Sequence, residues 1–450
     1  MDFSTKRMNV FIVLVSSLLM LLVSNLPFKA NQFGDMNFHT ESKNLALFIK
    51  GKVSFDKVVI TKAPGPILFY TPVYVLAPSD ATDQKLWLYA VVFLSIITTV
   101  SLLLIFRIAS FFFSKEVGLL SVLLFFIFPI HCYYSLGILA EIPAFFSLTL
   151  AIYGWTLAYQ NPDKIRGWLI LNFGMWLLIM NRPNAMLLLG LLFVVITYSF
   201  LRNKVFYENY GKKLSITFLI VCIFSFGGLQ LAKLTTLNKS GENQESLFYF
   251  VALQGRYQFR EEPFDFRFWD NTNRSDSKDY QNWGKSRKDL AMEMVKKNRS
   301  FNDVYKEFLI NDIVTNPFWT TRQFFVKCLY GNLNIISKVP PNQFVLGPFK
   351  GTIGYWSFLF ILNSINLIIL AGVVLFLFYE KKLINYWIFW GITVSLLVFH
   401  GLTYMEPRYI FPSKVGLYIM GAAGLYRIPL IKKIINRISV YIFPIHKLVR

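Results

Sequence analysis

The sequence is poor in charged residues and in cysteine. Asp, Glu, Lys and Arg make up 16% of the 450 residues, while hydrophobic residues reach 55% and aromatic residues 18%. Globular proteins have about 25% charged residues. The three cysteines, Cys132, Cys222 and Cys328, are isolated, which argues against a disulfide framework or a thiolate metal site. The histidines show no ligand spacing, and there is no P-loop, GxGxxG motif or internal repeat. This composition indicates an integral membrane protein.

Acidic residues are the scarcer charged type, with 25 Asp and Glu against 46 Lys and Arg, which gives a net charge of +21. The basic residues cluster in short segments that flank apolar runs. This pattern is typical of membrane proteins, whose cytoplasmic loops prefer positive charge. Nucleic-acid binding is therefore not needed to explain the charge. We expect membrane lipid, and no nucleic acid, among the partners.

The apolar runs predict an all-α polytopic membrane protein with about ten transmembrane helices, or more if short segments also span. The first run follows Lys6 and Arg7 and lacks a small-residue cleavage signal, so we expect an uncleaved helix with a cytoplasmic N-terminus. The helices are expected at roughly 8–26, 86–110, 117–135, 142–159, 167–181, 184–201, 214–234, 353–379, 383–403 and 409–427.

The segment from Pro66 to Pro78 fixes the orientation of the later helices. It is apolar but about 13 residues long and interrupted by Pro72, whereas a spanning helix needs roughly 20 residues. We interpret it as interfacial or re-entrant. Only then do most basic loops, such as those with Lys164 and Lys213, face the cytoplasm. The loops with Asp35, Glu141, Arg182 and Arg408 then face outside.

Four regions follow from this pattern. Residues 1–234 form an N-terminal transmembrane module, whose first external loop, 28–85, carries surface helices. Residues 235–352 form a larger, mostly helical external region. Residues 353–427 hold the last transmembrane helices, and residues 428–450 form a basic tail. The tail is amphipathic, so we expect it to touch anionic lipid at the cytoplasmic surface.

Short polar segments punctuate the apolar chain on the outer side. They are Gly34-Asp35, Lys62-Ala63-Pro64-Gly65-Pro66, Glu141, Asn181-Arg182-Pro183 and Glu406-Pro407-Arg408-Tyr409. Transfer of a group from a phosphate needs a base or an orienting acid, and it needs cations for the leaving phosphate. These segments supply both kinds of side chain beside the bilayer.

In their order and spacing, these segments resemble the GT-C membrane glycosyltransferases. The bacterial branch similar to dolichyl-phosphate-mannose protein mannosyltransferases and to lipid A aminoarabinose transferases is the nearest in pattern. The resemblance implies a bacterial inner-membrane enzyme that moves a sugar, hexosyl or pentosyl, from a polyprenyl-phosphate donor. The acceptor would be a lipid, glycan or protein at the periplasmic face. Two departures, Lys62-Ala63-Pro64 where many relatives have Lys-Pro-Pro and Glu141 where the lipid A branch has Asp, leave the sugar and the acceptor open.

Asp35 and Glu141 are the candidate catalytic residues. Asp35 would accept the proton of the acceptor hydroxyl or orient it, and its alternative role is to cap the following helix. Glu141 could assist Asp35, bind substrate hydroxyls, or complete a divalent-metal site with it. We expect no cofactor. A metal is not favoured, because Lys62 and Arg408 can stabilise a lipid monophosphate without one.

The candidate substrate-binding residues are Lys62, Arg182, Glu406, Arg408 and Tyr409. Lys62, on a proline-rich turn, would bind the donor phosphate, or else snorkel to the bilayer surface. Arg408 would neutralise the leaving phosphate, with Glu406 holding it or binding the acceptor. The last two could also simply pair with each other. Arg182 could sense phosphate, close the cavity or make a structural pair.

Two other functions are compatible with a polytopic protein of this composition. One is a transporter or flippase of lipid-linked glycans, which should show paired halves with broken helices and polar residues at the bilayer midplane. No repeat is visible in the sequence, and its polar segments lie at the surface. The other is an enzyme similar to O-antigen ligases or polymerases, with a diphosphate donor. The glycosyltransferase remains the leading hypothesis.

Overall fold

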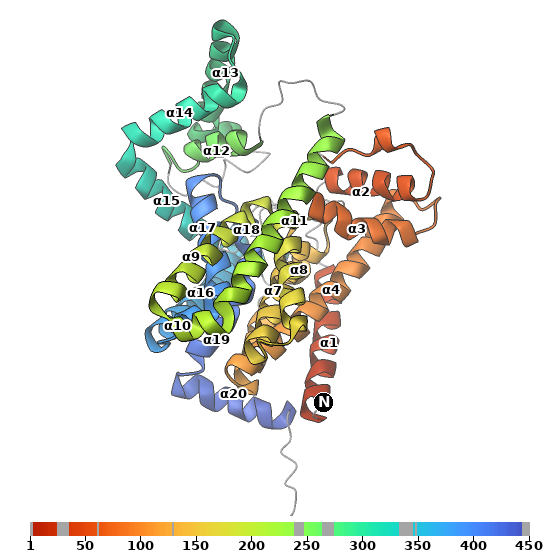
Figure 1. Ribbon diagram of the computed structural model, residues 1–450, viewed down its shortest axis with the longest axis vertical. Coiled ribbons are helices and arrows are strands. Elements are labelled where there is room, and N and C mark those ends of the chain that lie inside the picture. The colour runs from red at the N-terminus through yellow and green to blue at the C-terminus, as the bar shows by residue number, and fades with distance from the viewer. Residues whose placement is uncertain are drawn as a thin grey trace, which may run out of the picture. The chain divides into compact units, whose positions relative to one another are not determined.

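The computed structural model describes residues 3–24, 36–60, 63–127, 130–237, 247–262, 274–332, 345–346 and 349–442. This part of the chain is helical, apart from two short antiparallel strands, β1 (Val345–Leu346) and β2 (Phe349–Lys350) (Figure 1). Seven of the described helices are long and apolar enough to cross a membrane. The prediction of an all-α polytopic membrane protein is confirmed. The number of spans, about ten, stays a prediction.

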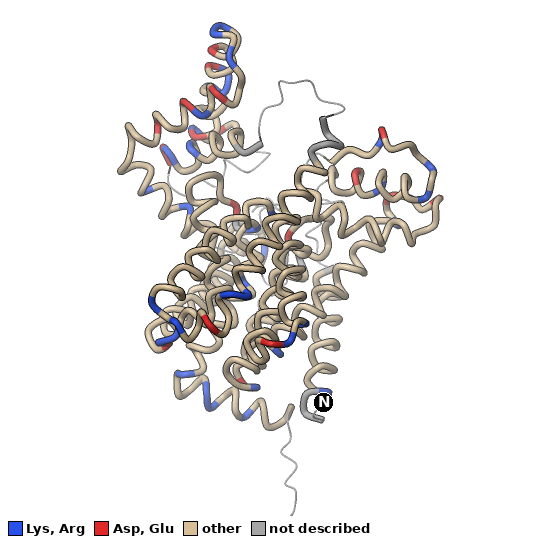
Figure 2. Tube along the Cα trace, in the orientation of Figure 1, with Lys and Arg blue, Asp and Glu red and all other residues tan. Residues whose placement is uncertain are grey.

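The chain divides into two compact units. Unit 1 comprises Met1–Thr235, Ser364–Thr393 and Pro412–Arg450, and unit 2 comprises Thr236–Asn363 and Val394–Phe411. Figure 2 shows that long helices of unit 1, such as α4, carry few charged residues along their lengths. In unit 2, by contrast, the helix α13 carries many.

Most of unit 1 is helical. Its helices are α1 (Phe3–Ser24), α2 (Met36–Ile49), α3 (Pro64–Leu76), α4 (Asp83–Phe112), α5 (Lys115–Ile127), α6 (Ile130–Ser135), α7 (Glu141–Gln160), α8 (Ile165–Asn181), α9 (Leu187–Arg202), α10 (Lys204–Phe206), α11 (Lys212–Leu237), α19 (Lys414–Leu425) and α20 (Pro429–Ile442), with the short helices η1 (Phe55–Lys57), η2 (Pro183–Met186), η3 (Tyr207–Gly211), η7 (Leu383–Tyr386) and η8 (Phe411–Ser413) between them. Two further helices, α16 (Gly351–Tyr379) and α17 (Trp387–Leu402), belong partly to each unit, and the ends of α11 and η8 also extend into unit 2.

The first external loop contains more helix than the sequence indicates. Its surface helix, α2, begins at Met36, directly after Asp35. It packs on α3, where Lys50 Nζ donates to the carbonyl oxygens of Tyr74 and Ala77 at 3.0 and 2.6 Å. These are carbonyls at the end of α3, which a helix leaves without partners of its own. With 13 residues, α3 is about 20 Å long and shorter than the roughly 30 Å hydrocarbon core.

Two antiparallel helices, α7 and α8, form the best-packed hairpin of unit 1 (Figure 1). Glycines line their contact. A Cβ added to Gly154 would overlap the backbone of Leu171, and one added to Gly174 would overlap the backbone of Ala151. Small residues of this kind let membrane helices approach closely, so that van der Waals packing holds them together. Because the helices are antiparallel, the hairpin brings the start of α7, at Glu141, to the end of α8.

The described part of unit 2 contains four longer helices and two short ones, besides its shares of α16 and α17. They are α12 (Leu247–Tyr257), α13 (Lys278–Lys297), α14 (Phe301–Thr315) and α15 (Pro317–Asn332), with η5 (Arg274–Asp276) before α13 and α18 (Pro407–Ile410) near the end of the chain. Serines cap α13 and α14, because the side chains of Ser277 and Ser300 accept hydrogen bonds from backbone N–H groups of the first turn. Leu253, Trp283 and Tyr305 lie in the apolar core of the unit.

The C-terminal helix α20 is amphipathic, as expected. Ile435 and Ser439 are buried, while the apolar Leu430 and Tyr441 are exposed. Lys433, also exposed, lies on the same helix. Contact of this helix with anionic lipid stays a prediction.

The α7–α8 hairpin provides a test of the packing. Gly154→Val places side-chain atoms where the backbone of Leu171 lies, so the helices must separate. We expect a loss of about 1–3 kcal/mol in the free energy of unfolding, measured by denaturation of the purified protein in bicelles. Gly190→Val in α9 is the matched control, because nothing lies within 4 Å of a Cβ at Gly190. Equal stability of both variants would contradict the close packing.

Candidate active site

Five of the seven candidate residues lie in the described part of the chain. Glu141 and Arg182 belong to unit 1, and Glu406, Arg408 and Tyr409 belong to unit 2. Asp35 and Lys62 lie outside the residues that the structure describes.

Glu141 and Arg182 form a buried ion pair. The Arg182 Nη2 atom donates to the Glu141 Oε1 atom at 2.7 Å, and the two side chains are 12% and 3% exposed. Glu141 is the first residue of α7, and Arg182 follows the last residue of α8. Because Pro183 disfavours helical geometry in the residue before it, Arg182 leaves the helix with φ −141° and ψ 87°. The Asn-Arg-Pro sequence thus ends α8 at the residue that pairs with Glu141.

The start of α3 lies against this ion pair. A Cβ added to Gly65 would overlap the backbone of Met180 and Asn181, immediately before Arg182. Only glycine allows this approach. Further along α3, the Tyr70 hydroxyl donates to the Leu139 carbonyl at 2.6 Å and accepts from the Leu139 N–H at 3.0 Å. The described part of the Lys62 segment is therefore packed on the backbone next to both members of the pair.

The pair has a chemistry suited to an oxyanion. A guanidinium has five N–H donors in a planar fork, and Arg182 donates through Nη2 to Glu141. Such a fork can bind a carboxylate on one edge and a phosphate on another. Asn181, the neighbour of Arg182, donates through Nδ2 to the Ser147 hydroxyl at 3.1 Å and to the Leu177 carbonyl at 2.8 Å. The hydrogen bond from Asn181 to Ser147 thus ties the end of α8 to α7 beside the Glu141–Arg182 pair.

In unit 2, Glu406 and Arg408 also form an ion pair, between Glu406 Oε2 and Arg408 Nε. The other carboxylate oxygen of Glu406 accepts the Tyr404 hydroxyl at 2.7 Å. The Arg408 guanidinium lies over the Tyr409 ring, 5.2 Å from its centroid, and His400 stacks on that ring at 4.7 Å. Arg408 is 35% exposed, so solvent reaches this cation more than Arg182.

Tyr404 and His400 are partners that the sequence analysis missed, because no local pattern distinguishes them from other aromatic residues near a membrane helix. Burial raises the pKa of Tyr404 well above its usual range, and the neighbouring Glu406 charge raises it further. Tyr404 is therefore a neutral hydrogen-bond donor to Glu406 across the physiological pH range. His400 Nδ1 lies 2.8 Å from the Tyr404 carbonyl oxygen.

No group of three or more His, Cys, Asp or Glu side chains could hold a metal ion among the described residues. The charged partner of Glu141 there is Arg182 rather than a second carboxylate. Asp35, the other acid of the possible metal site, lies outside the described residues, so the expectation of no metal remains a prediction.

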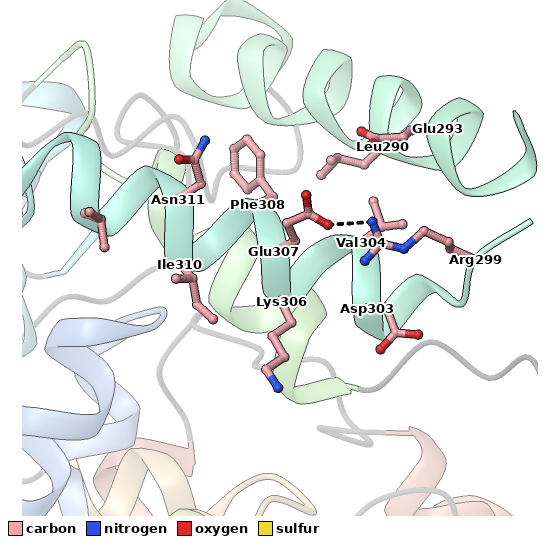
Figure 3. A pocket seen from close by; sticks show the side chains of 11 residues that line it. Leu290, Glu293, Arg299, Asp303, Val304, Lys306, Glu307, Phe308, Ile310 and Asn311 are labelled. Atoms are coloured by element: carbon pink, nitrogen blue, oxygen red, sulfur yellow. Dashed lines mark hydrogen bonds and ion pairs between the residues drawn. The ribbon is translucent and has the colours of Figure 1, made fainter. Parts of the chain in front are cut away.

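A groove of about 800 Å³ lies between α13 and α14 of unit 2 (Figure 3). The Arg299–Glu307 ion pair lies in it, and the Arg299 hydrogen bond holds the pKa of Glu307 below its usual value. Acidic and basic side chains alternate along the groove, and no candidate site residue lines it.

The comparisons with known proteins give one kind of similarity. No family model and no curated protein matches the sequence. The structure is similar to two crystal structures of ArnT from Cupriavidus metallidurans, one bound to undecaprenyl phosphate and one in the apo state. Both are 12% identical in sequence, and each match covers 93% of this chain and 77% of the ArnT chain, with TM-scores of 0.38 and 0.39.

The Glu141–Arg182 pair makes a prediction about stability. Glu141→Gln leaves the Arg182 charge buried without its carboxylate, so we expect a loss of about 3–5 kcal/mol in the free energy of unfolding. In Glu141→Gln/Arg182→Met both charges are absent, and most of that loss should be recovered. The control is Asp163→Asn, which breaks the pair between Lys213 and the 97% exposed Asp163 and should cost less than about 1 kcal/mol. A double variant as unstable as the single one would contradict the ion pair.

Proposed function

We propose that this protein is an integral-membrane glycosyltransferase that moves a sugar from a polyprenyl-phosphate donor to a hydroxyl acceptor at the outer membrane face. The observation that carries the proposal is the buried Glu141–Arg182 pair packed against the start of α3, the helix that follows Lys62. Three polar segments that are far apart in the sequence thus converge in unit 1. Ionisable side chains buried among apolar helices are expensive, and they usually mark a functional site.

The chemistry of transfer accounts for the types of residue. The acceptor oxygen attacks the anomeric carbon, its proton passes to the Asp35 carboxylate, and the bond from that carbon to the phosphate oxygen breaks. The leaving lipid phosphate changes from a diester with one negative charge to a monoester with two. Cations that face this growing charge stabilise the transition state more than the ground state, which is the condition for faster turnover. Lys62 and Arg408 are assigned this role.

The remaining candidates support these groups. Glu141 holds Arg182 at the end of α8 and is the next candidate base after Asp35. Arg182 binds phosphate or closes the cavity beside the Lys62 segment. Glu406 holds Arg408, and Tyr409 lies under the Arg408 guanidinium. No cofactor is assigned, and the sugar and the acceptor stay open. A bacterial inner membrane with the site at the periplasmic face is the location that the charge pattern and the motif resemblance favour.

The catalytic assignment is tested with Asp35→Asn. Asn keeps the size and hydrogen bonding of Asp but cannot accept the proton, so we expect turnover to fall by roughly 100-fold or more, with donor binding retained. Transfer of radiolabelled sugar from a purified polyprenyl-phosphate donor and equilibrium donor binding are the two measurements. Asp56→Asn, at an exposed Asp of the same loop, is the matched control. Near-normal turnover of Asp35→Asn would favour the helix-capping role, since Asn caps as well as Asp.

The donor-binding assignment is tested with Lys62→Ala and Arg408→Ala. Each removes a cation that faces the phosphate, and we expect a loss on the order of 2–4 kcal/mol in transition-state stabilisation, measured as kcat/KM for the donor. Lys62→Arg should restore only part of it, because the guanidinium differs in shape from the ammonium group. Lys57→Ala is the control in the same loop. Unchanged donor kinetics in both alanine variants, at normal expression, would remove Lys62 and Arg408 from the site.

A further inference from the structure

The turn that carries Glu406 is buried but lacks regular secondary structure. It spans residues 403–406, between α17 and α18. Thr403 and Tyr404 are 6% exposed and Met405 is completely buried. Buried backbone N–H and C=O groups need hydrogen-bond partners. Here the partners come largely from side chains, and most of these belong to helices that are distant in the sequence.

Gln258 satisfies both backbone groups of Met405. Its Nε2 atom donates to the Met405 carbonyl at 2.7 Å, and its Oε1 atom accepts from the Met405 N–H at 2.9 Å. Of the neutral side chains, only the carboxamides of Asn and Gln can donate and accept in this paired way. The geometry is that of two residues paired across neighbouring strands, with a side chain in place of one strand.

Lys327 binds the neighbouring carbonyl. Its Nζ atom donates to the Thr403 carbonyl oxygen from the middle of α15, and its side chain is completely buried. Burial lowers the pKa of Lys327 well below its usual range, and the nearby Arg256 charge lowers it further. A Met or Leu at this position would avoid the cost of burying an amine. The buried amine is therefore best explained by its hydrogen bond to the Thr403 carbonyl.

Gln323 and a glycine support the end of α12. The Nε2 atom of Gln323 donates to the carbonyls of Gly255 and Arg256 at 2.9 and 3.2 Å, and also to that of Gln258. A Cβ added to Gly255 would overlap the Thr403 carbonyl. Only glycine lets the end of α12 come this close to the turn.

We propose that Gln258, Gln323 and Lys327 are positioning residues that fix the 403–406 turn so that Arg408 presents its guanidinium to the donor phosphate. These three residues are called the clamp below. The link runs through the Tyr404 hydroxyl, which donates to Glu406, and through Glu406, which pairs with Arg408. This inference rests on the proposed function, in which Arg408 binds the donor. The external region then contributes to the reaction by holding the turn, in addition to any part in acceptor binding.

The expected effect follows from the precision that phosphate binding requires. A shift of about 1 Å in a binding group can reduce the rate by as much as about 100-fold. Gln258→Met keeps approximate volume but removes both hydrogen bonds to Met405. We expect it to lower kcat/KM for the donor by about 10-fold or more, with a raised donor KM as part of that loss. Gln281→Met, at an exposed Gln of α13 in the same unit, is the matched control and should leave the donor KM unchanged.

A double-mutant cycle with Arg408→Ala separates positioning from general stability. If the clamp acts through Arg408, Gln258→Met should add little to the donor KM once Arg408 is Ala. If it only stabilises the fold, its effect should be the same in both backgrounds. If Gln258→Met does not fold, Gln323→Met provides a second cycle. In that variant Gln258 is still present and can keep its hydrogen bonds to Met405. Thermal unfolding of every variant in the same detergent checks that each is folded during the assay.

The outcomes distinguish the two proposals. A raised donor KM in Gln258→Met or Gln323→Met that disappears in the Arg408→Ala background supports the clamp. A normal donor KM in both Gln258→Met and Gln323→Met overturns the clamp, and so do effects that are fully additive with that of Arg408→Ala. In either case, a raised donor KM in Arg408→Ala still supports the proposed function. Unchanged donor kinetics in Arg408→Ala remove Arg408 from donor binding and overturn the clamp, whereas the donor assignment of the proposed function fails only if Lys62→Ala is unchanged as well.

Discussion

The ion pair between Glu141 and Arg182 is the interaction on which the arrangement of unit 1 depends. Among apolar helices, each of these charges is stabilised by the other, which lies 2.7 Å away. The pair requires the start of α7 and the end of α8 to coincide, which in turn requires the two helices to run antiparallel at glycine-to-backbone distance. The same end receives the start of α3, where Gly65 meets the Met180 and Asn181 backbone. Packing and electrostatics therefore specify one geometry together.

In unit 2 the 403–406 turn buries backbone amides, and the Gln258 carboxamide provides hydrogen bonds that a helix or strand would otherwise provide. Lys327 binds the Thr403 carbonyl, and Gln323 holds the backbone at the end of α12, including the Gln258 carbonyl. Buried networks of this kind are rigid when every member is satisfied. Glu406 is the last residue of the turn and Arg408 follows it, and both stay partly exposed. A rigid turn that ends in an accessible ion pair suits a group that must meet a substrate.

Much of the helical pattern was predictable, because apolar runs bounded by Pro and by polar residues define it. The 165–181 helix ends before Arg182-Pro183 as the sequence indicates, and the 141–160 helix begins at Glu141. Where Pro412 occurs, the expected helix at 409–427 is divided into α18, η8 and α19, since proline lacks the N–H that an uninterrupted helix needs. The start of α2 at Met36 was not predictable, because its polar residues are used in contacts with α3 and α4 that periodicity cannot show. One such contact is that of His39 Nδ1 with the Tyr74 hydroxyl, at 2.9 Å.

The residues of the site also fall into two groups, those that the sequence indicated and those that it did not. The charged motifs were visible because acids and arginines are rare in this chain and occur between apolar runs. Gln258, Gln323 and Lys327 were not visible, since a Gln or Lys in a mixed polar region has no local signature. Their partners lie up to 147 residues away in the sequence. The hydrogen bonds of Gln258 and Lys327 to one short turn, and those of Gln323 to the end of α12, become apparent only in the folded chain.

In the proposed function, the balance of charge at the two ion pairs constrains how the donor can bind. Glu141 with Arg182, and Glu406 with Arg408, each sum to zero, whereas the leaving phosphate would gain a negative charge during transfer. Lys62 would then supply the positive charge that the two pairs lack. A guanidinium has several N–H donors, so Arg408 can face the phosphate while its Nε atom stays paired with Glu406 Oε2. The Tyr404 hydroxyl holds the other carboxylate oxygen, Glu406 Oε1. Tyr404 therefore links the rigidity of the turn to the position of the Arg408 guanidinium.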